Sequence, residues 1–300
     1  MIFFVPSPVC NKWHTGKTTA SWEDSGDVMT FLRVGLIGFG SIGSAVAGRL
    51  RLGEAGPCTL AAVLVRGHSL GTANRVRSGD CVVTANPDEF FGQSLDVVVE
   101  GAGQVALRQY GARALESGAD LVVTSTGALS DDSFRGELIR LAGTHGRRVL
   151  VSSGAIAGLD GISAAAMGRV EEALHITRKP PVAWKGTIAE QQHDLDHLTV
   201  PVVLYEGSPR ESAQLFPANV NVQTAVALAG VGLDRTRVKV VADPTVEHNV
   251  HEVLLRGEFG ELRIELKNVP SPENPKTGRL TALAVIKTLR NLTAPLVVGA

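Results

Sequence analysis

The chain has 300 residues with a formal net charge of −1, and 44% of its residues are hydrophobic while 20% are charged. This length predicts about two domains of ~150 residues each, with enough chain to bury a substantial core. The balanced charge argues against a broad surface for nucleic acid or membrane, and no apolar run reaches the ~18 residues of a membrane span.

Residues 1–29 differ from the rest of the chain and are predicted to form a mobile leader. The apolar run before Pro6 is too short for the core of a signal peptide, and Pro8 follows it. Three acidic residues within 23–27 argue against a transit peptide, which is poor in acids. Met29 is a candidate start of the native protein, because the first predicted strand begins just after it.

The three cysteines are scattered as Cys10, Cys58 and Cys81. They form neither a CxxC metal pair nor an even set that suggests a disulfide framework. Such cysteine usage favours the reducing cytoplasm, where we expect this protein to work.

From residue 31 to about 151, short β-rich runs alternate with segments of helical periodicity. The predicted strands cover 33–37, 60–65, 81–84, 96–100, 120–124 and 148–152, and the predicted helices cover 41–52, 87–91, 104–117 and 130–145. Apolar strands spaced by helices are typical of βαβ units, which form a parallel sheet covered on both faces. We therefore predict an α/β fold with a Rossmann-type, doubly wound parallel sheet over residues 30–155.

The first predicted strand runs directly into Gly-x-Gly-x-x-Gly, formed by Gly38, Gly40 and Gly43. In a dinucleotide site the first glycine allows the tight turn, the second leaves room for pyrophosphate, and the third lets the helix pack closely on the strand. The N–H groups of the helix start, at Ser41 and Ile42, then face the phosphates. An ordinary strand–helix turn without ligand is the alternative. The strand before the motif and the helix after it favour the nucleotide site.

The end of the second predicted strand bears on the choice of cofactor. A site that prefers NAD usually carries an Asp or Glu there for the ribose 2′-hydroxyl. This chain has Arg66 instead, which can bind the 2′-phosphate of NADP, although a solvated loop arginine is the alternative. We therefore expect NAD or NADP as cofactor, with a leaning towards NADP.

Beyond residue 155 the pattern changes to a second domain, predicted to be α+β and to span 156–276. Predicted helices cover 156–170, 206–215 and 220–231, and predicted strands cover 171–179, 199–205, 237–242, 246–256 and 261–267. Three successive strands without intervening helices predict a mixed or antiparallel sheet. The terminal segment 277–300, with a predicted amphipathic helix at 277–292, is expected to pack back on the first domain. A cleft between the two domains is the natural place for substrate to meet cofactor.

Four stretches of the second half combine small, amide and imidazole side chains. They are 153–160 (SGAIAGLD), 216–222 (FPANVNV), 242–251, which ends Asn-Val-His, and 268–277 (NVPSPENPKT). With these motifs in this order and spacing, the chain from about residue 30 resembles the L-aspartate dehydrogenase family. The resemblance implies a dinucleotide-binding domain followed by a mixed α/β domain, usually in a homodimer. It also implies oxidation of L-aspartate to iminoaspartate with NAD or NADP, followed by hydrolysis to oxaloacetate and ammonia or use in quinolinate and NAD synthesis.

The resemblance also assigns roles to individual residues. The catalytic histidine falls on His251, and the alanine and asparagine that contact the cofactor fall on Ala155 and Asn221. Hydride leaves Cα of an amino acid readily only when the amine nitrogen has a free lone pair. A base with a pKa near the working pH is therefore needed, and imidazole, at ~6.5, is suitable.

A dicarboxylate substrate also needs cationic or N–H partners. Lys276 is predicted to lie at the start of the last helix, where N–H groups also favour an anion, and we assign it to a substrate carboxylate. A solvated lysine is the alternative. Asn219 and Asn221 each offer an amide to the nicotinamide carboxamide or to substrate, although a helix cap is an equally natural place for an asparagine.

Other readings of the chain remain open at this point. His193 and His197 can share a helix face around two aspartates, but no third ligand has a convincing spacing, so a solvated loop is favoured over a metal site. Glu100 is interpreted as a cap or structural hydrogen-bonding residue. A homoserine-dehydrogenase-like or dipicolinate-reductase-like oxidoreductase shares the two-domain plan, and a sensor that binds NAD(P) without turnover is a third possibility.

Overall fold

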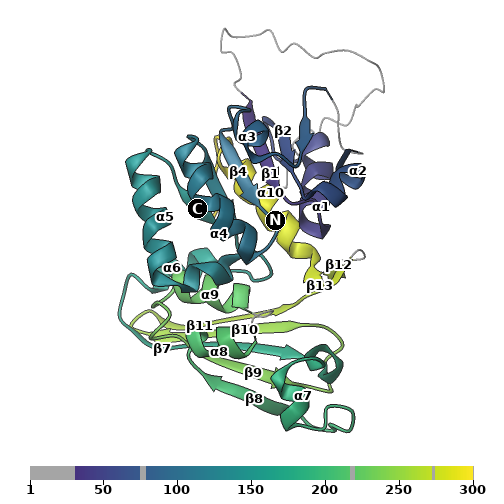
Figure 1. Cartoon of the computed structure of the whole chain (residues 1–300). Coiled ribbons are helices and arrows are strands. Elements are labelled where there is room, and N and C mark those ends of the chain that lie inside the picture. The colour runs from purple at the N-terminus through teal and green to yellow at the C-terminus, as the bar shows by residue number, and fades with distance from the viewer. Residues whose placement is uncertain (1–30, 75–78, 217–219, 272–273, 300) are drawn as a thin grey trace, which may run out of the picture. The chain divides into compact units, whose positions relative to one another are not determined.

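The computed structural model describes residues 31–74, 79–216, 220–271 and 274–299, and it gives only the backbone at 271 and 274–277. The predicted leader at 1–29 lies outside these residues. The described chain holds two large β-sheets, each with its own helices, and one short two-stranded ribbon (Figure 1). None of the helices in this part of the chain is long and apolar enough to cross a bilayer.

The first sheet is parallel throughout and has the strand order β3-β2-β1-β4-β5-β6. Its strands are β1 (Leu32–Ile37), β2 (Cys58–Leu64), β3 (Val82–Thr84), β4 (Val97–Glu100), β5 (Asp120–Val123) and β6 (Val149–Val151). This is the order of a Rossmann fold, so the predicted doubly wound sheet is confirmed. Each observed strand lies within two residues of its predicted limits.

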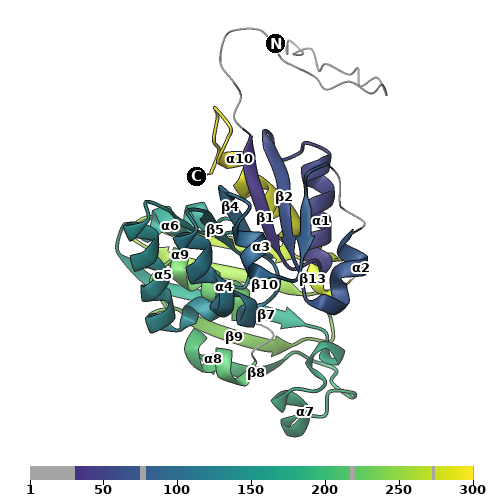
Figure 2. The ribbon, with the colours of Figure 1, turned by 45° about the horizontal axis from the view of Figure 1, so that its top comes forward.

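Helices cover both faces of this sheet, which explains why its strands are apolar over most of their length rather than at every second position. The helices are α1 (Ser41–Arg51), α2 (Leu70–Ala73), α3 (Pro87–Phe91), α4 (Gln104–Glu116), α5 (Asp132–Thr144) and α10 (Arg279–Asn291). Val98 of β4 packs in the core under α3, α4 and α5, whereas its neighbours Val97 and Val99 pack in the core under α1 and α10. The last helix of the chain, α10, thus contacts α1 of the first domain (Figures 1 and 2). The domain limits at 155 and 276 stay predictions.

The second sheet is mixed, with the order β11-β10-β7-β9-β8, as predicted. Its strands are β7 (Val170–Lys179), β8 (Val202–Gly207), β9 (Arg237–Ala242), β10 (Val250–Gly257) and β11 (Gly260–Lys267). Only the β7–β9 pair is parallel, and the other three pairs are antiparallel. Ile162 of α6 (Leu159–Ala165) and Val226 of α9 (Val220–Ala229) pack with Val253 and Leu255 of β10, so these helices cover one face of the sheet.

One predicted helix is wrong in its extent, and the last helix begins two residues later than predicted. The helix expected over 156–170 is reduced to α6, because Gly158 at its N-cap is left-handed, with φ of +71°, and the chain turns after Ala165 into β7. The helix expected over 277–292 begins only at Arg279. Before it, β12 (Pro270–Ser271) and β13 (Asn274–Gly278) form the two-stranded ribbon.

Candidate active site

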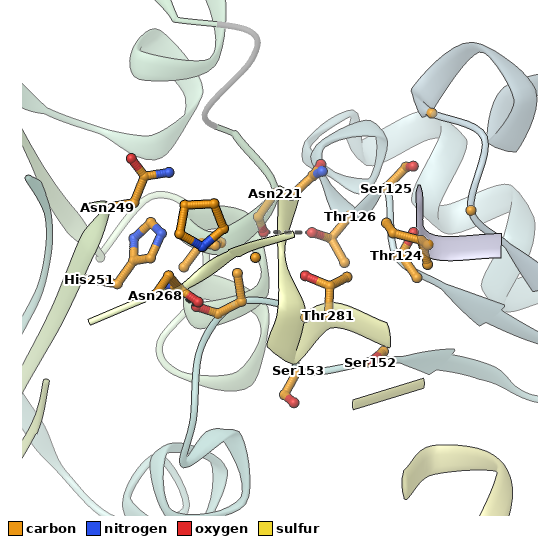
Figure 3. A pocket seen from close by; sticks show the side chains of 18 of the residues that line it. Thr124, Ser125, Thr126, Ser152, Ser153, Asn221, Asn249, His251, Asn268 and Thr281 are labelled. Carbon is orange, nitrogen blue, oxygen red and sulfur yellow. Dashed lines mark hydrogen bonds between the residues drawn. The ribbon is translucent and has the colours of Figure 1, made fainter. Parts of the chain in front are cut away.

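A cavity of about 390 Å³ lies where the carboxyl ends of the first sheet meet the second sheet (Figure 3). One wall comes from the start of α1 and the loops after β4, β5 and β6, and it comprises Ile42, Gly101, Ala102, Gly103, Thr124, Ser125, Thr126, Ser152, Ser153, Gly154 and Ala155. The opposite side comprises Lys179, Asn221, Val222, Asn249, His251, Asn268, Pro270, Gly278 and Thr281. A cavity outside the carboxyl ends of parallel strands is the expected binding place in this fold.

The glycine fingerprint fits a bound dinucleotide. Gly38 has φ of +95°, and a Cβ on Gly43 would lie 2.2 Å from the carbonyl oxygen of Gly38, so both positions require glycine. A Cβ on Gly40 would meet nothing within 4 Å, so open space lies above this turn. Gly40 is the N-cap of α1, and the first turn, with Ser41 and Ile42, contains no acidic residue. The helix therefore presents its N-terminal N–H groups and its positive dipole end to an anion.

Glu100 fixes the two loops that follow β4 and β5. Its side chain is fully buried and accepts hydrogen bonds from the N–H groups of Ala102 and Gly103, both at 2.8 Å. It also accepts from the N–H and hydroxyl of Ser125 at 3.1 and 2.9 Å. Burial raises the pKa of this carboxyl group, and the hydrogen bonds act in the opposite direction. Glu100 is thus the structural hydrogen-bonding residue that the sequence suggested, and it shapes one wall of the cavity.

Ala155 and Asn221 both line the cavity, on different elements. The Asn221 side-chain oxygen accepts a 2.9 Å hydrogen bond from the N–H of Gly127, and its backbone carbonyl accepts one from the Thr126 hydroxyl at 2.5 Å. The start of α9 is therefore tied to the loop after β5. Asn219, the other predicted amide, lies outside the described residues.

His251 lies on β10, and its ring lines the cavity with only 5% of the residue exposed (Figure 3). Its Nδ1 is 3.3 Å from Thr177 Oγ1 and 3.3 Å from His175 Nε2, both on β7. The register sets this contact, because His251 stands directly opposite Thr177. Burial first, and then the electrostatic effects of His175 and Lys179, hold the pKa of His251 well below its ordinary value. The ring is therefore neutral at neutral pH, with Nε2 as the nitrogen left for a substrate.

His175 is fully buried behind His251, and their rings stack with centroids 5.4 Å apart and planes 17° apart. Burial lowers the pKa of His175 to about 4, so this ring too is neutral at neutral pH. Its Nδ1 has no hydrogen-bond partner among the described residues. Sequence reasoning did not identify His175 or Thr177. The period of two along β7 was the available signal, but it shows nothing until the partner strand is known.

Three polar residues, Lys179, Asn249 and Asn268, form a row across the end of the second sheet beside His251. Asn268 donates its backbone N–H to the carbonyl of Asn249 at 2.9 Å. The antiparallel register of β10 and β7, continued one residue beyond Val250 and Arg178, places Asn249 beside Lys179. Asn268 also donates its side-chain N–H to the carbonyl of Ala155 at 3.1 Å. The row is therefore linked to the loop after β6.

Two further predicted ligands, Lys276 and Arg66, stay predictions. Lys276 was expected at the start of the last helix, but it lies within β13, three residues before α10 begins at Arg279. The predicted helix start is therefore wrong, because Lys276 lies in an extended strand, and its contact with a substrate carboxylate stays a prediction. Arg66 is exposed at the carboxyl end of the β2 segment, directly before a short 3₁₀ turn (Gly67–Ser69). Its contact with a cofactor stays a prediction.

The segment with His193 and His197 follows a short helix, α7 (Ile188–Gln192). His197 pairs with Asp194 at 2.8 Å, and both side chains are largely exposed. Within the described residues, no group of three side chains is placed to bind a metal. The metal reading thus gains no support here.

Comparisons with known proteins give a family match for each half of the chain. Residues 160–292 match the family model described as aspartate dehydrogenase, C-terminal, and residues 38–152 match the NAD-binding domain of homoserine dehydrogenase. The chain is 42% identical over 270 residues to L-aspartate dehydrogenase 3 of Bordetella bronchiseptica, which covers 89% of this chain and 97% of that protein. It is 36% identical over 270 residues to the L-aspartate dehydrogenase of Methanosarcina acetivorans, which covers 89% and 99%.

Solved structures agree with these matches. The crystal structure of aspartate dehydrogenase from Thermotoga maritima is similar, with a TM-score of 0.69 and 26% identity, covering 90% of this chain and all of that one. A homoserine dehydrogenase from Thiobacillus denitrificans has a TM-score of 0.59 at 16% identity, covering 88% of this chain and 73% of that one. At that identity the likeness shows the shared fold alone.

Proposed function

The chain belongs to the L-aspartate dehydrogenase family, and we propose that it oxidises L-aspartate to iminoaspartate with His251 as general acid and base. As a member it is an NAD(P)-dependent oxidoreductase rather than a nucleotide sensor, and NAD or NADP is its cofactor. One observation carries the proposal: a neutral, buried imidazole lines the cavity that the glycine-rich loops and the second sheet enclose. It is the histidine to which the family resemblance assigns the catalytic role.

The chemistry divides between the cofactor and the chain. When bound, the nicotinamide accepts the hydride that leaves Cα of the substrate. His251 Nε2 takes a proton from the substrate ammonium group, which frees the nitrogen lone pair for the C=N bond. Loss of this proton and of the hydride together converts the ammonium form of the substrate to the protonated imine, C=NH2+. The same base can then activate the water that hydrolyses the imine to oxaloacetate and ammonia, unless the imine leaves for quinolinate synthesis.

The surroundings of His251 suit a base that must gain and lose a proton. If Nε2 accepts the proton, Nδ1 carries the ring hydrogen and can donate it to Thr177 Oγ1 or His175 Nε2. Because the pKa of His175 is about 4, that ring stays an uncharged acceptor and adds no second cation. His175 and Thr177 are therefore proposed as positioning residues that fix the tautomer and orientation of His251.

The cofactor is proposed to lie across the first sheet. Gly38, Gly40 and Gly43 shape its turn, and the N–H groups around Ser41 and Ile42 are expected to face its pyrophosphate. Ala155 and Asn221 are proposed to contact the nicotinamide end, since both line the cavity next to His251.

A direct assay tests the proposed reaction. Formation of reduced cofactor is followed by absorbance with L-aspartate, D-aspartate, L-asparagine and L-homoserine, and the reverse reaction is followed with oxaloacetate plus ammonia. We expect turnover with L-aspartate well above the other amino acids. No rate with aspartate in either direction would remove the proposal, and a preference for homoserine would favour the homoserine-dehydrogenase-like reading.

The lowered pKa of His251 predicts the acidic side of the pH profile. Protonation inactivates the base, so kcat/KM falls only as the pH drops through the pKa of the free enzyme's histidine. Because this pKa lies well below the ordinary 6.5, we expect kcat/KM to stay on its plateau from neutral pH to below pH 6.5. Initial rates in buffers of constant ionic strength measure the acidic limb of the kcat/KM profile. An acidic limb above pH 6.5 would contradict the neutral, buried state of this ring.

Arg66 is proposed to select NADP through its 2′-phosphate. A hydrogen bond to a charged group contributes about 1.5–3 kcal/mol, so Arg66→Ala is expected to weaken NADP⁺ binding by roughly 10–100-fold. NAD⁺ lacks that phosphate, and its Kd should change less than threefold. Calorimetric titration of both cofactors gives the two values. Equal losses for NAD⁺ and NADP⁺ would show that Arg66 does not read the 2′ position.

A homodimer and a cytoplasmic location stay predictions. The face of the second sheet opposite His251 bears Leu174 and Ile176 of β7 and Leu254 of β10, which are half-buried among charged neighbours. This mixed face is our candidate for the contact between two subunits.

A further inference from the structure

We infer that Lys179 binds the side-chain carboxylate of the substrate and thereby selects an acidic amino acid. This inference rests on the proposed oxidation of aspartate and adds a residue that recognises its second carboxylate. It starts from the electrostatics of the cavity. Among the described residues that line it, Lys179 is the only lysine or arginine, and none is an aspartate or glutamate. These described residues therefore offer an anionic substrate a basic side chain and no carboxylate.

The strand geometry points this lysine to the same side as the catalytic ring. Side chains alternate along a strand, so His175, Thr177 and Lys179 of β7 share one face. Thr177 stands opposite His251, and Asn249 follows at the position beside Lys179. Lys179 therefore lies one two-residue step, about 6.6–6.8 Å along the strand, beyond the pair that holds the imidazole.

The ammonium group is held by an aromatic ring. Lys179 Nζ lies 5.2 Å from the ring centroid of Trp184, which is fully buried and therefore fixed in place. A cation–π contact of this kind orients an ammonium group without removing its charge. The strand end is also fixed, because the Lys179 carbonyl accepts a 2.8 Å hydrogen bond from the N–H of Asp243.

The spacing indicates which carboxylate Lys179 binds. In aspartate the α-carboxylate carbon is two bonds from the amine nitrogen, whereas the side-chain carboxylate carbon is three bonds away. When the amine of the substrate lies at His251, the side-chain carboxylate is the group that extends far enough to reach Asn249 and Lys179. Asn249 lies in that row and lines the cavity, so its amide can donate to the same carboxylate (Figure 3). The positive charge of Lys179 also lowers the pKa of His251, which links the substrate subsite to the base.

The test compares Lys179→Met with the wild type, using L-aspartate and L-asparagine as substrates. Asparagine keeps the α-carboxylate and replaces the side-chain carboxylate by an amide. We expect Lys179→Met to raise the KM for aspartate by about 100-fold or more, and to lower kcat/KM for asparagine less than threefold. The selectivity for aspartate should therefore collapse. Lys179→Arg keeps the charge and is expected to restore most of it.

Two further readouts separate substrate binding from structural damage. The Kd of NADP⁺ and the thermal unfolding midpoint should match the wild type, and removal of the positive charge should move the acidic limb of kcat/KM to higher pH. Succinate has two carboxylates but no amine to oxidise. In calorimetric titration of the cofactor-loaded protein, Lys179→Met should lose the succinate binding that the wild type shows. Lys287→Met, which removes an exposed lysine on α10, is the matched control and should behave as the wild type.

The outcomes distinguish the inference from the proposed function. If the wild type does not oxidise aspartate, the proposed function fails, whatever the variant does. If the wild type is active and Lys179→Met keeps its preference for aspartate over asparagine, the inference alone is overturned. Equal losses for both substrates would assign Lys179 to the α-carboxylate, and weaker binding of NADP⁺ would assign it to the cofactor. Either result overturns the inference as stated.

Discussion

Replacing His251 with alanine is expected to lower kcat for aspartate oxidation by roughly 10²–10⁴-fold, the usual contribution of a general base. The variant keeps the cavity but loses the only group that we propose takes the ammonium proton. The Kd of the cofactor should stay within threefold of the wild-type value, because the glycine fingerprint lies on the other sheet. Steady-state rates at saturating aspartate, together with calorimetric titration of NAD⁺ and NADP⁺, measure both quantities.

The control for this variant is His248→Ala. His248 lies three residues earlier in the chain and is exposed, so the same substitution removes an imidazole outside the cavity. Its kcat should equal that of the wild type. A second comparison, His251→Asn, keeps a hydrogen-bonding side chain without a titratable base, and it should be as slow as the alanine variant. An unchanged kcat in either His251 variant would exclude this residue as the base.

In the proposed mechanism, His175 and Thr177 behind His251 allow its ring to act as a base although it is buried. A buried histidine is costly to charge, which keeps it neutral and ready to accept a proton. In the proposed mechanism the imidazolium that forms needs a hydrogen-bond acceptor at Nδ1, and both Thr177 Oγ1 and His175 Nε2 lie 3.3 Å away. The substrate carboxylates add negative charge nearby and favour the same protonated state. Base strength is thus expected to rise when substrate is bound.

The fold of the first domain was predictable because its signals are local. Each strand is an apolar run that ends in a turn, and the helices that follow show the apolar periodicity of a helix with one buried face. Val97, Val98 and Val99 show why consecutive positions of a strand are apolar, since successive side chains enter opposite cores. The glycine fingerprint was equally predictable, because the two positions that require glycine, Gly38 and Gly43, lie within six residues of sequence.

The substrate side of the cavity was less predictable, because it depends on pairing between distant strands. β7 was identified as a strand, but which of its faces meets the cavity is decided by its register with β10, more than 70 residues later. The cationic residue was therefore sought at Lys276, next to an expected helix start. The structure instead places Lys276 in β13, a strand of the two-stranded ribbon. A lysine that does line the cavity, Lys179, comes from the end of β7.

Replacing Gly43 with alanine is expected to weaken binding of NAD⁺ and NADP⁺ by roughly 100-fold. The added Cβ would lie 2.2 Å from the carbonyl oxygen and 3.0 Å from the carbonyl carbon of Gly38, and a backbone group cannot move aside cheaply. Relief requires α1 to shift away from β1, which overpacks the core at a cost of about 1–3 kcal/mol. The shift also withdraws the N–H groups at Ser41 and Ile42 from the phosphates, each such bond contributing about 1.5–3 kcal/mol. Calorimetric titration measures the Kd, and thermal unfolding measures the stability.

Gly48→Ala separates the effect of this contact from the general effect of adding a methyl group to α1. Gly48 lies in the same helix, and a Cβ there would meet nothing within 4 Å. Alanine is the better helix former by about 0.5–1 kcal/mol, so this variant should be slightly more stable and should bind both cofactors as the wild type does. Gly43→Ala should instead lose affinity for NAD⁺ and NADP⁺ alike, because both carry the pyrophosphate. If Gly43→Ala binds either cofactor with wild-type affinity, the close approach of α1 to the turn does not hold the phosphates, and the fingerprint must act in another way.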